Sequence, residues 1–540
     1  MVANYIKNIF LKYKKSRIRK LIRNYRDFKA AKGSGVFFNV RKNLATVKLE
    51  KNSDSKFQSL FLGGYFPNEL MIRQLLNRRI DSQKIQKKLL LSPKKIAFPM
   101  PVEWVEILEK EEFVVSRLRS SFLWTLYVLA LGGFAILISL GEVYSSFQAR
   151  NTPRNKKFTQ FIQLGRSSIP TNTDQETTTL IGWYATWKGR PNSVKVLRHS
   201  AYLHQRKKFN QIYIEGAQKE LPNVSIIKAL YLFLWTIIAF FTGACELLFG
   251  KWWLLFSLHE IVLAKKMQLV CSSQLAEQYL FSHDHCIYRP AWTYIVENRG
   301  SDCCVYFYST NSVSIKSEYG EREFYRAFSY MNWSKYLVWT PEHKEQLLKF
   351  SKENIFVRDE KFIVVGAPIP LSDNDRPLPV FKKNTISIFD VTPTRLSFYV
   401  ELCLHVDYFT PRNSKKFLRD IESLRQQLGF NVVLKSKREN KSIHDPSYIR
   451  LLASLKEFGW LILDPTTSPN RIINGSEASI HFPFTSTGVI ASELKKKSIY
   501  YDPSGNIASD DEASLGPILV NSKESLRAFI VSVLSENQSD

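Results

Sequence analysis

The sequence has few cysteines, and they are not arranged to hold a metal or a disulfide framework. Its 540 residues include six, at positions 245, 271, 286, 303, 304 and 403. None forms a Cys-x-x-Cys pair and the spacing is irregular, which excludes the usual patterns of a zinc site or a secreted disulfide scaffold. The adjacent Cys303 and Cys304 lie in an apolar run and are expected to be buried free thiols. The cysteines indicate a reducing compartment.

Two common nucleotide-binding motifs are also missing. Neither Gly-x-x-x-x-Gly-Lys-Ser/Thr nor Gly-x-Gly-x-x-Gly occurs, so a P-loop ATPase and a dinucleotide oxidoreductase have no motif support. The only Asp-x-Asp, Asp373-Asn-Asp375, lies in a Pro-rich stretch, where a solvated turn is expected. His283-Asp-His285 has no further ligand spaced to join it. We therefore expect neither a metal nor a cofactor.

The chain has much positive charge. Its 76 Lys and Arg residues exceed its 49 Asp and Glu residues, giving a formal net charge of +27. This charge predicts attraction to polyanions, which include nucleic acid, an anionic membrane surface and phosphorylated ligands. Hydrophobic residues make up 44% of the chain, which excludes a mainly disordered protein. Its length exceeds the roughly 250–300 residues at which one core stops growing, so at least two domains are expected.

The first 32 residues contain eleven Lys and Arg but only one acid, Asp27. Aromatic and aliphatic residues recur between these cations at spacings of three to five, which on a helix gives an apolar stripe bordered by positive charge. A helix lying on an anionic membrane is the favoured interpretation. A solvated basic helix and a nucleic-acid-binding arm remain alternatives. The segment has no uninterrupted apolar region or cleavage site of a signal peptide, so export is not expected.

Two long apolar segments bear on the same question. Residues 121–141 and 229–245 carry no charge, and the first is long enough to span a bilayer while the second is marginal. If both spanned, residues 142–228, with fourteen Lys and Arg against five Asp and Glu, would lie outside, against the positive-inside bias. A hairpin dipping into one leaflet, or two helices buried under a Rossmann layer, agrees better with the charges.

The rest of the chain predicts alternating strands and helices. Helical periodicity covers 259–281, and short strands are expected at 302–310 and 361–369. After a Pro- and Asp-rich stretch the alternation begins again at 385–393. Such alternation predicts an α/β fold in which two parallel sheets, each with helices on both faces, form two facing Rossmann-like domains. The predicted parts are a basic and apolar helical region, the first domain, a linker and the second domain, at 1–95, 96–370, 371–384 and 385–540.

The most distinctive loop of the second half is HFPFTSTG, residues 481–488. A buried strand ends at its start, and Thr485, Ser486, Thr487 and Gly488 lead directly into a helix. Hydroxyls and backbone N–H groups at a helix N-terminus can form an anion cradle suited to a phosphate. Ordinary N-capping by Ser and Thr explains the same residues equally well.

Other loops predicted at the same sheet edge carry polar groups. Asp390 and Thr392 follow the first strand of the second half. Lys435 and Lys437 alternate to one face of an extended segment, and His444 comes shortly after them. A pair of cations with a histidine could neutralise and protonate a leaving phosphate.

Several motifs together resemble one family. HFPFTSTG, followed by SIYYDPSG at 498–505, is similar to the bacterial polysaccharide-biosynthesis proteins that are named for their Pro-Phe-Thr-Ser motif. The first half agrees with that family through YRPAWTYIVENRGSDCCVYFYSTN at 288–311 and VVGAP at 364–368. The resemblance covers roughly residues 225–510. It implies glycosyltransferase-like enzymes of the two-domain GT-B type, acting on surface polysaccharide such as capsule or O-antigen.

The resemblance also implies a mechanism and a location. A nucleotide sugar, with cytidine monophosphate as one carrier, would bind the second half and pass its sugar to a glycan or lipid-linked acceptor held by the first, without a metal. The expected location is the cytoplasmic face of a bacterial plasma membrane, peripheral or monotopic. A non-catalytic scaffold of polysaccharide assembly is the alternative function, and a nucleic-acid-binding protein is disfavoured because no reader motif is present.

The resemblance finally supplies roles for individual residues. The candidate bases are Glu297, Asp284 and Glu260, with His444 as a further catalytic residue. The expected donor-binding residues are Thr485, Ser486, Thr487, Gly488, Lys435, Lys437, Asp390 and Thr392. The expected acceptor-binding residues are Arg289, Trp292, Tyr308, Ser309 and Asn311.

Overall fold

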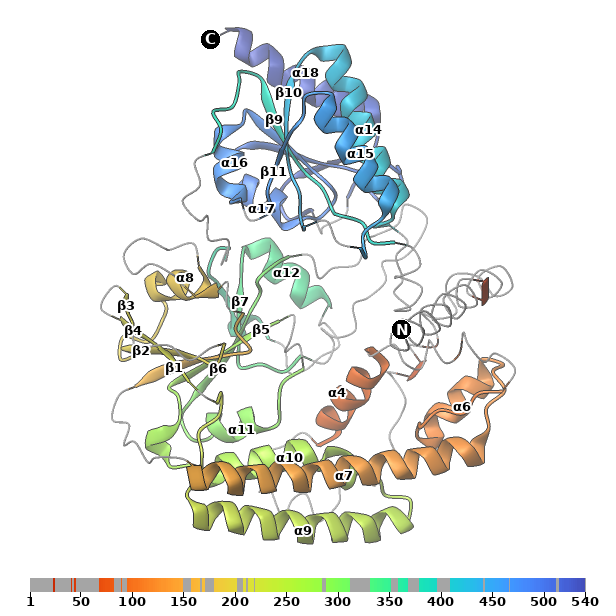
Figure 1. Ribbon diagram of the computed structural model, residues 1–540, viewed down its shortest axis with the longest axis vertical. Helices are drawn as coiled ribbons and strands as arrows, with labels where there is room; N and C mark the ends of the chain where they lie inside the picture. The colour runs from red at the N-terminus through yellow and green to blue at the C-terminus, as the bar shows by residue number, and fades with distance from the viewer. Residues whose placement is uncertain are drawn as a thin grey trace, which may run out of the picture.

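The computed structural model contains two α/β units, one above the other, on a layer of long helices (Figure 1). It describes residues 95–539 except for 149–156, 166–167, 170–178, 202–206, 210–211, 218, 284–287, 311–330, 351–357, 368–377, 396–407, 440–441, 466 and 511–513. Before residue 95 it describes 23–24, 40, 43–44, 68–81 and 89. The predicted membrane helix at 1–32 therefore lies almost entirely outside the described residues, and the linker lies partly outside them.

The C-terminal unit is a six-stranded parallel sheet with the Rossmann strand order. The order is β11-β10-β9-β12-β13-β14, so the first strand of the unit is central and the chain reverses direction across the sheet between β9 and β12. Its strands are β9 (Thr385–Phe389), β10 (Asn431–Lys435), β11 (Leu461–Leu463), β12 (Ala478–His481), β13 (Lys497–Tyr501) and β14 (Ile518–Val520).

Among the described residues, five helices flank this sheet, and local sequence signals set their ends. They are α14 (Pro411–Leu428), α15 (Pro446–Glu457), α16 (Pro469–Gly475), α17 (Ser486–Glu493) and α18 (Lys523–Ser539). The hydroxyl of Thr410 caps α14 by accepting from Asn413 N–H, and Gly429, with φ of 72°, ends that helix in the left-handed region. Asp445 caps α15 in the same way.

The N-terminal unit has an eight-stranded sheet in the order β3-β4-β2-β1-β5-β6-β7-β8, in which only β3 is antiparallel to its neighbour. The strands are β1 (Phe158–Ile162), β2 (Val196–His199), β3 (Lys207–Phe209), β4 (Ile212–Gly216), β5 (Gln278–Ser282), β6 (Asp302–Tyr306), β7 (Lys335–Val338) and β8 (Phe362–Val364). Short helices α8 (Leu180–Thr186), α11 (Trp292–Glu297) and α12 (Pro341–Phe350) connect or flank them. The predicted α/β class with two Rossmann-like sheets is confirmed.

One predicted element is wrong in part. The helix expected at 259–281 ends at Leu269, and residues 278–282 are strand β5 near the centre of the sheet. All five residues of β5 are buried, because helices or loops cover both faces of this sheet. A strand buried on both faces has no alternation of apolar and polar residues, so its periodicity cannot distinguish it from a helix.

A layer of helices lies under the N-terminal unit. It contains α7 (Arg117–Gln148), α9 (Ile226–Leu248) and α10 (Trp253–Leu269), with α6 (Val102–Lys110) and α4 (Asn68–Asp81) beside them (Figure 1). The helices α7 and α9 are long and apolar enough to cross a membrane, and only 28% and 33% of their most apolar windows is buried. Most of the apolar surface of α7 and α9 is therefore not covered by protein. The interpretation that both helices are buried under a Rossmann layer is wrong.

The three helices of this layer pack closely because Leu255 of α10 lies against glycines of α7 and α9. A Cβ atom added to Gly132 of α7 would lie 2.8 Å from Leu255 of α10 and 2.9 Å from Phe240 of α9. A Cβ atom added to Gly243 of α9 would lie 2.9 Å from the same leucine. Glycine at these two positions therefore allows Leu255 to insert between α7 and α9.

Replacing Gly132 with Val should destabilise the protein by about 1–3 kcal/mol, because the added methyl groups have no space beside Leu255 and Phe240. Denaturant unfolding measures the change. Gly133→Val is the matched control, since a Cβ atom there meets nothing within 4 Å. Equal stability of the two variants would contradict the close packing of this layer.

Candidate functional site

The two units approach each other at the carboxyl ends of their central strands. The backbone N–H of Thr310, which follows β6, donates to Ser486 Oγ of α17 across 3.3 Å. A cavity of about 300 Å³ also lies between the two units, lined by Trp339 and Thr340 after β7 and by Val489 and Ser492 of α17. Ligands of open α/β sheets bind at this edge of the strands, where the strand order reverses. The candidate site is therefore this edge.

The loop from His481 to Gly488 is held in one shape by buried contacts. Phe484 has φ of 59°, a left-handed backbone that a large side chain rarely adopts. The Tyr500 hydroxyl donates to Thr485 O across 2.7 Å. A Cβ atom on Gly488 would lie 2.4 Å from the ring of Tyr500, so no other residue fits there without displacement. The strained turn and the glycine place the start of α17 directly above β12.

Two of the three hydroxyls expected to cradle a phosphate make bonds inside the loop. Thr485 Oγ1 donates to Phe482 O across 3.0 Å, and Thr487 Oγ1 lies 2.9 Å from His481 Nδ1 and 3.2 Å from Thr485 Oγ1. Ser486 is the one whose hydroxyl reaches the other unit. The sequence could not distinguish the inward hydroxyls from the outward one, because all three precede the helix in one polar run.

His481 is the hidden support of this loop and was not among the expected site residues. It is fully buried, its Nε2 lies 2.7 Å from Ser479 Oγ, and its ring stacks on Phe389 of β9 at 5.0 Å. Burial lowers the pKa of His481 to about 3, so its imidazole is neutral. In the sequence, the signal for His481 is its position as the first residue of the HFPFTSTG motif.

The predicted group after β9 and β10 does come together. The Asp390 carboxyl is buried and accepts a hydrogen bond from the Tyr448 hydroxyl of α15. Thr394 forms an isolated antiparallel bridge with His444, which brings the loop after β9 beside the loop that precedes α15. Lys435 is the last residue of β10, next to Phe389 in the sheet register. Tyr448 was not predicted, since its position on a helix is distant in sequence from either loop.

Electrostatics in this group are unusual for a surface loop. Burial raises the pKa of the Asp390 carboxyl to about 6 and lowers the pKa of the Lys435 ammonium to about 8, while the attraction of Asp390 opposes the second shift. Asp390 Oδ1 and Thr392 Oγ1 are buried, with no hydrogen-bond partner among the described residues. Unsatisfied buried polar atoms are costly, and at a strand end they indicate a place for a polar ligand. Lys437 is exposed two residues beyond Lys435.

Two of the predicted catalytic and acceptor residues instead form a buried ion pair. The Arg289 guanidinium contacts the Glu297 carboxylate, donates to Thr293 Oγ1 across 2.8 Å and lies 3.9 Å from the centre of the Tyr294 ring. Glu297 also accepts from Ser334, which immediately precedes β7. This pair lies at the amino ends of the strands, because Glu297 ends the helix that leads into β6. Its position opposite the candidate site argues against Glu297 as the base.

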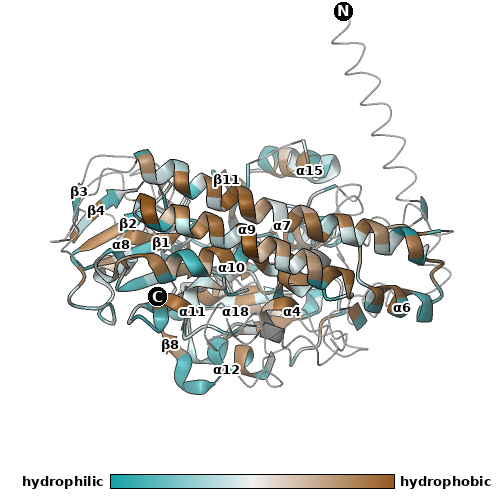
Figure 2. Ribbon diagram, turned by 90° about the horizontal axis from the view of Figure 1, so that it is seen from below, coloured by the Kyte–Doolittle hydropathy of each residue, from teal (hydrophilic) through white to brown (hydrophobic). Residues whose placement is uncertain are grey.

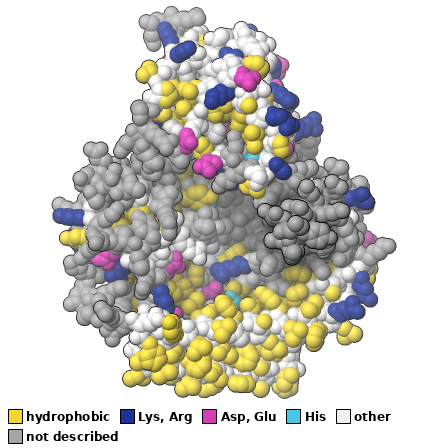
Figure 3. Space-filling view, in the orientation of Figure 1, with side chains coloured by type: hydrophobic (Ala, Val, Ile, Leu, Met, Phe, Trp, Pro, Cys, Tyr) yellow, Lys and Arg dark blue, Asp and Glu magenta, His cyan; other side chains and the backbone are white. Residues whose placement is uncertain are grey.

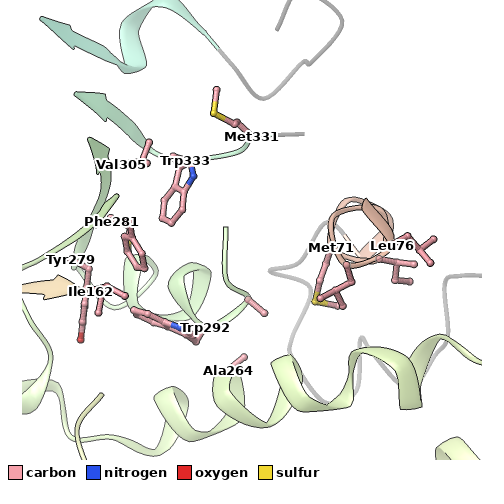
Figure 4. Packing of buried hydrophobic residues seen from close by; sticks show 14 of the residues in the cluster. Met71, Leu76, Ile162, Ala264, Tyr279, Phe281, Trp292, Val305, Met331 and Trp333 are labelled. Carbon is pink, nitrogen blue, oxygen red and sulfur yellow. The ribbon is translucent and has the colours of Figure 1, made fainter. Parts of the chain in front are cut away.

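Glu260 and Trp292 are also parts of the packing of the N-terminal unit. Glu260 Oε1 lies 3.1 Å from Arg78 Nη1 of α4, and its Oε2 accepts from Ala291 N–H. Trp292 is buried against Tyr279 and Phe281 of β5 (Figure 4). Neither residue lies at the edge that faces the C-terminal unit. Both residues thus contribute to the packing of this unit.

Of the remaining predicted residues, some lie at the edge that forms the candidate site, and others lie outside the described residues. Tyr308 and Ser309 follow β6 and lie at the edge, together with His283 after β5, whose Nδ1 accepts from Tyr308 N–H across 3.2 Å. His283 was considered only as a metal ligand in the sequence. Asp284 and Asn311 lie outside the described residues. Among the described ranges, no three His, Cys, Asp or Glu side chains are grouped to hold a metal ion.

Comparisons with known proteins were made against these observations. A family model described as polysaccharide biosynthesis PFTS motif protein matches residues 235–530. No curated protein matches the chain. Among solved structures it is similar to the UDP-GlcNAc 2-epimerase of Methanocaldococcus jannaschii in complex with UDP-GlcNAc and UDP, with 13% identity and a TM-score of 0.29 over 52% of this chain and 74% of that chain. A likeness this distant does not indicate what this chain binds.

Replacing Glu297 with Ala should destabilise the protein by about 3–5 kcal/mol, because it leaves the Arg289 charge buried without its carboxylate. Thermal and denaturant unfolding measure the loss. Glu106→Ala, at an exposed position of α6, is the control and should change stability by less than about 0.5 kcal/mol. Full stability of Glu297→Ala would show that the pair is not structural.

The buried His481 makes stability depend on pH. Unfolded histidine takes up a proton near pH 6.5, whereas the folded side chain takes one up only near pH 3. The free energy of unfolding should therefore fall as pH decreases from about 6.5 toward 3, by up to about 1.4 kcal/mol per pH unit for this residue. Urea unfolding at several pH values should show a shallower fall in His481→Gln. The same slope in both proteins would contradict a neutral His481.

Proposed function

The chain belongs to the polysaccharide biosynthesis PFTS motif family, whose model matches more than half of it, and from this premise we propose that it is a glycosyltransferase-like enzyme. In this proposal it transfers a sugar from a nucleotide-sugar donor to a glycan or lipid-linked acceptor of a surface polysaccharide such as capsule or O-antigen. A sugar activated by cytidine monophosphate is one candidate donor. The C-terminal unit binds the donor, and the N-terminal unit binds the acceptor.

One observation carries the proposal, the group of polar residues where the strand order reverses between β9 and β12. Asp390 and Thr392 follow β9 and keep buried oxygen atoms without partners among the described residues. Lys435 at the end of the adjacent β10 supplies a positive charge, and the N-terminus of α17 follows β12 at the same edge. Hydroxyl, carboxylate and ammonium groups are the partners that a ribose and a phosphate require.

The reaction would use these groups as follows. The bond between the anomeric carbon and the phosphate oxygen breaks, and the acceptor hydroxyl oxygen bonds to that carbon. The phosphate gains negative charge as it leaves, so Lys435, Lys437 and the positive end of the α17 dipole stabilise it. His444 donates a proton to the phosphate, and Asp390 accepts a hydrogen bond from the ribose. Cationic side chains do the work of charge neutralisation here, so the scheme needs no metal.

The acceptor hydroxyl must lose its proton to a base in the N-terminal unit. Glu297 and Glu260 are held in ion pairs by Arg289 and Arg78, so of the predicted carboxylates we retain Asp284, two residues after β5. Tyr308 and Ser309, after the neighbouring β6, would contact the acceptor.

The proposal includes a location on the cytoplasmic face of a bacterial plasma membrane. The cysteines within the described ranges are Cys245, Cys271, Cys303 and Cys304, and all are free. Free thiols agree with a reducing compartment. The two apolar helices agree with a membrane nearby.

Lys435→Met should weaken nucleotide binding at least about tenfold, because it removes a charged hydrogen-bond donor worth roughly 1.5–3 kcal/mol while keeping the buried stem. Calorimetry with cytidine, uridine and guanosine mono- and diphosphates measures the affinity. In the wild type the affinity should fall as pH rises through about 8, where Lys435 loses its proton. The fall should be shallower in Lys435→Met but not absent, because desolvation also lowers the pKa of Lys437 to about 8.

Lys456→Ala is the charge-matched control, since Lys456 is exposed on α15 away from the strand ends. It should bind nucleotide like the wild type. Nucleotide binding that is identical in Lys435→Met and Lys456→Ala would reject the donor site. Tight binding of a nucleotide sugar with no transfer to any acceptor would favour the scaffold instead.

A further inference from the structure

The helices α7 and α9 expose an apolar surface on the side away from both sheets, which we call the apolar base. Its residues are large and hydrophobic, and each is at least 46% exposed: on α7, Leu118, Phe122, Leu126, Phe134, Leu137, Leu140, Tyr144 and Phe147, and on α9, Ile227, Leu230, Tyr231, Leu234, Ile238, Phe241 and Leu248. Figure 2 shows both helices from below, and Figure 3 shows hydrophobic side chains gathered across the bottom of the molecule.

The apolar base is separate from the face that packs into the protein. On α7 the buried residues, among them Trp124, Val128 and Gly132, recur at spacings of three or four, so they form one stripe toward α10. The exposed residues recur at similar spacings on another side of the helix. A helix of a water-soluble protein normally has polar residues on its exposed side. Both helices are instead apolar on both sides, so the apolar base requires a cover.

The fold determines whether α7 and α9 can both cross a membrane. Strands β1 to β4 lie in the chain between α7 and α9, and β1 pairs in parallel with β5, which follows both helices. If both helices crossed a membrane, this intervening chain would lie on the opposite side from β5. Because it is part of the same sheet, α7 and α9 lie along one surface of the protein. Ser145 near the end of α7 and Asn223 just before α9 are 3.4 Å apart, so the two helices are antiparallel neighbours.

The charges around the apolar base indicate what kind of partner covers it. Arg119 and Glu142 bound a stretch of α7 without charge, and Lys228 and Glu246 bound such a stretch of α9. Exposed cations flank these stretches at Arg119, Lys228 and Lys251, while Arg117 is paired with Glu109 and Glu142 is buried against Lys266 at 2.9 Å. An apolar centre with a cationic border is complementary to the acyl chains and head groups of an anionic bilayer.

We infer that the apolar base inserts into one leaflet of an anionic bilayer, with α7 and α9 parallel to the membrane plane. At 1.5 Å per residue the 32-residue α7 is about 48 Å long, longer than the roughly 30 Å hydrocarbon core. In-plane insertion accommodates this length without tilt or mismatch. The N-terminal unit then lies next to the lipid and the C-terminal unit lies farthest from it (Figure 1).

Flotation of the full-length protein with vesicles tests the inference. The vesicles contain phosphatidylglycerol or only phosphatidylcholine, and at about 0.1 M salt the wild type should bind the first more tightly. A second set at about 1 M salt, where the Debye length is about 3 Å, suppresses binding through basic residues alone and isolates the apolar contribution. The test variant combines Phe134→Gln, Leu137→Gln, Leu234→Gln and Phe241→Gln. The fraction bound to anionic vesicles should fall at least about tenfold in this variant.

The control combines Val380→Gln in the linker with Phe458→Gln and Ile518→Gln in the C-terminal unit, all three being exposed apolar residues. It should float like the wild type. Equal flotation of the test variant and the control would overturn the inference. So would a dimer in the absence of lipid that the four substitutions dissociate, since a second copy of the chain would then cover the apolar base.

A second measurement needs no substitution of the apolar base. Cys245 is exposed on α9, and vesicles should protect its thiol from a water-soluble reagent in the wild type. Undiminished reactivity would count against insertion. In sealed membrane vesicles with the cytoplasmic face outward, cysteines placed at Asn192 and Lys456 should both react with an impermeant reagent. Reaction at only one of them would establish a spanning hairpin.

The proposed function can fail independently of this inference. Nucleotide affinity of the four-residue variant should equal that of the wild type, because its substitutions lie on the apolar base and far from Lys435. Wild-type binding to vesicles without any nucleotide affinity would reject the donor site and leave the membrane surface standing.

Discussion

The parallel pairing of β1 with β5 is the constraint on which the rest of this structure depends. It joins chain from between the two apolar helices to chain that follows both, with Thr159 opposite Gln278 and Ile162 opposite Phe281. Each backbone N–H and C=O of these buried strands needs its partner in the ladder, so the pairing cannot be given up cheaply. It therefore prevents α7 and α9 from both crossing a membrane, because the strands between them would then lie on the opposite side from β5. It also places the reversal of strand order in the N-terminal unit between β1 and β5.

Buried charged groups are of two kinds in this protein. Some have all their hydrogen-bonding atoms paired, and others keep an atom without a partner among the described residues. Arg289 and Glu297 satisfy each other and several neighbours, which fixes α11 against the start of β7. Asp390 is equally buried, yet one of its oxygens has no partner among the described residues and its pKa is raised to about 6. A satisfied pair stabilises a fold, whereas an unsatisfied group at a strand end has a free energy that a ligand can lower.

Each sequence motif contains residues that hold the local structure and residues that lie at the edge between the two units. In HFPFTSTG the histidine, the first threonine and the glycine hold the turn, through Ser479, Phe482 O and the ring of Tyr500. Ser486 alone reaches toward the other unit. In the motif around residue 289, Arg289 and Trp292 serve the core, while Tyr308 and Ser309 lie at the edge. These motifs thus combine residues that hold the local structure with residues that lie at the edge between the two units.

The sequence by itself determined the α/β class, the second Rossmann unit from residue 385, and the family, because short strands, turn residues and long motifs are local signals. It also placed Asp390, Lys435 and His444 at one edge, since parallel strands end together. Only the tertiary structure decided that 278–282 is a strand, because a strand buried on both faces has no helical or alternating pattern to distinguish it. Only the structure separated Glu297 from the site and laid α7 and α9 along the protein, because both follow from contacts between segments far apart in the chain.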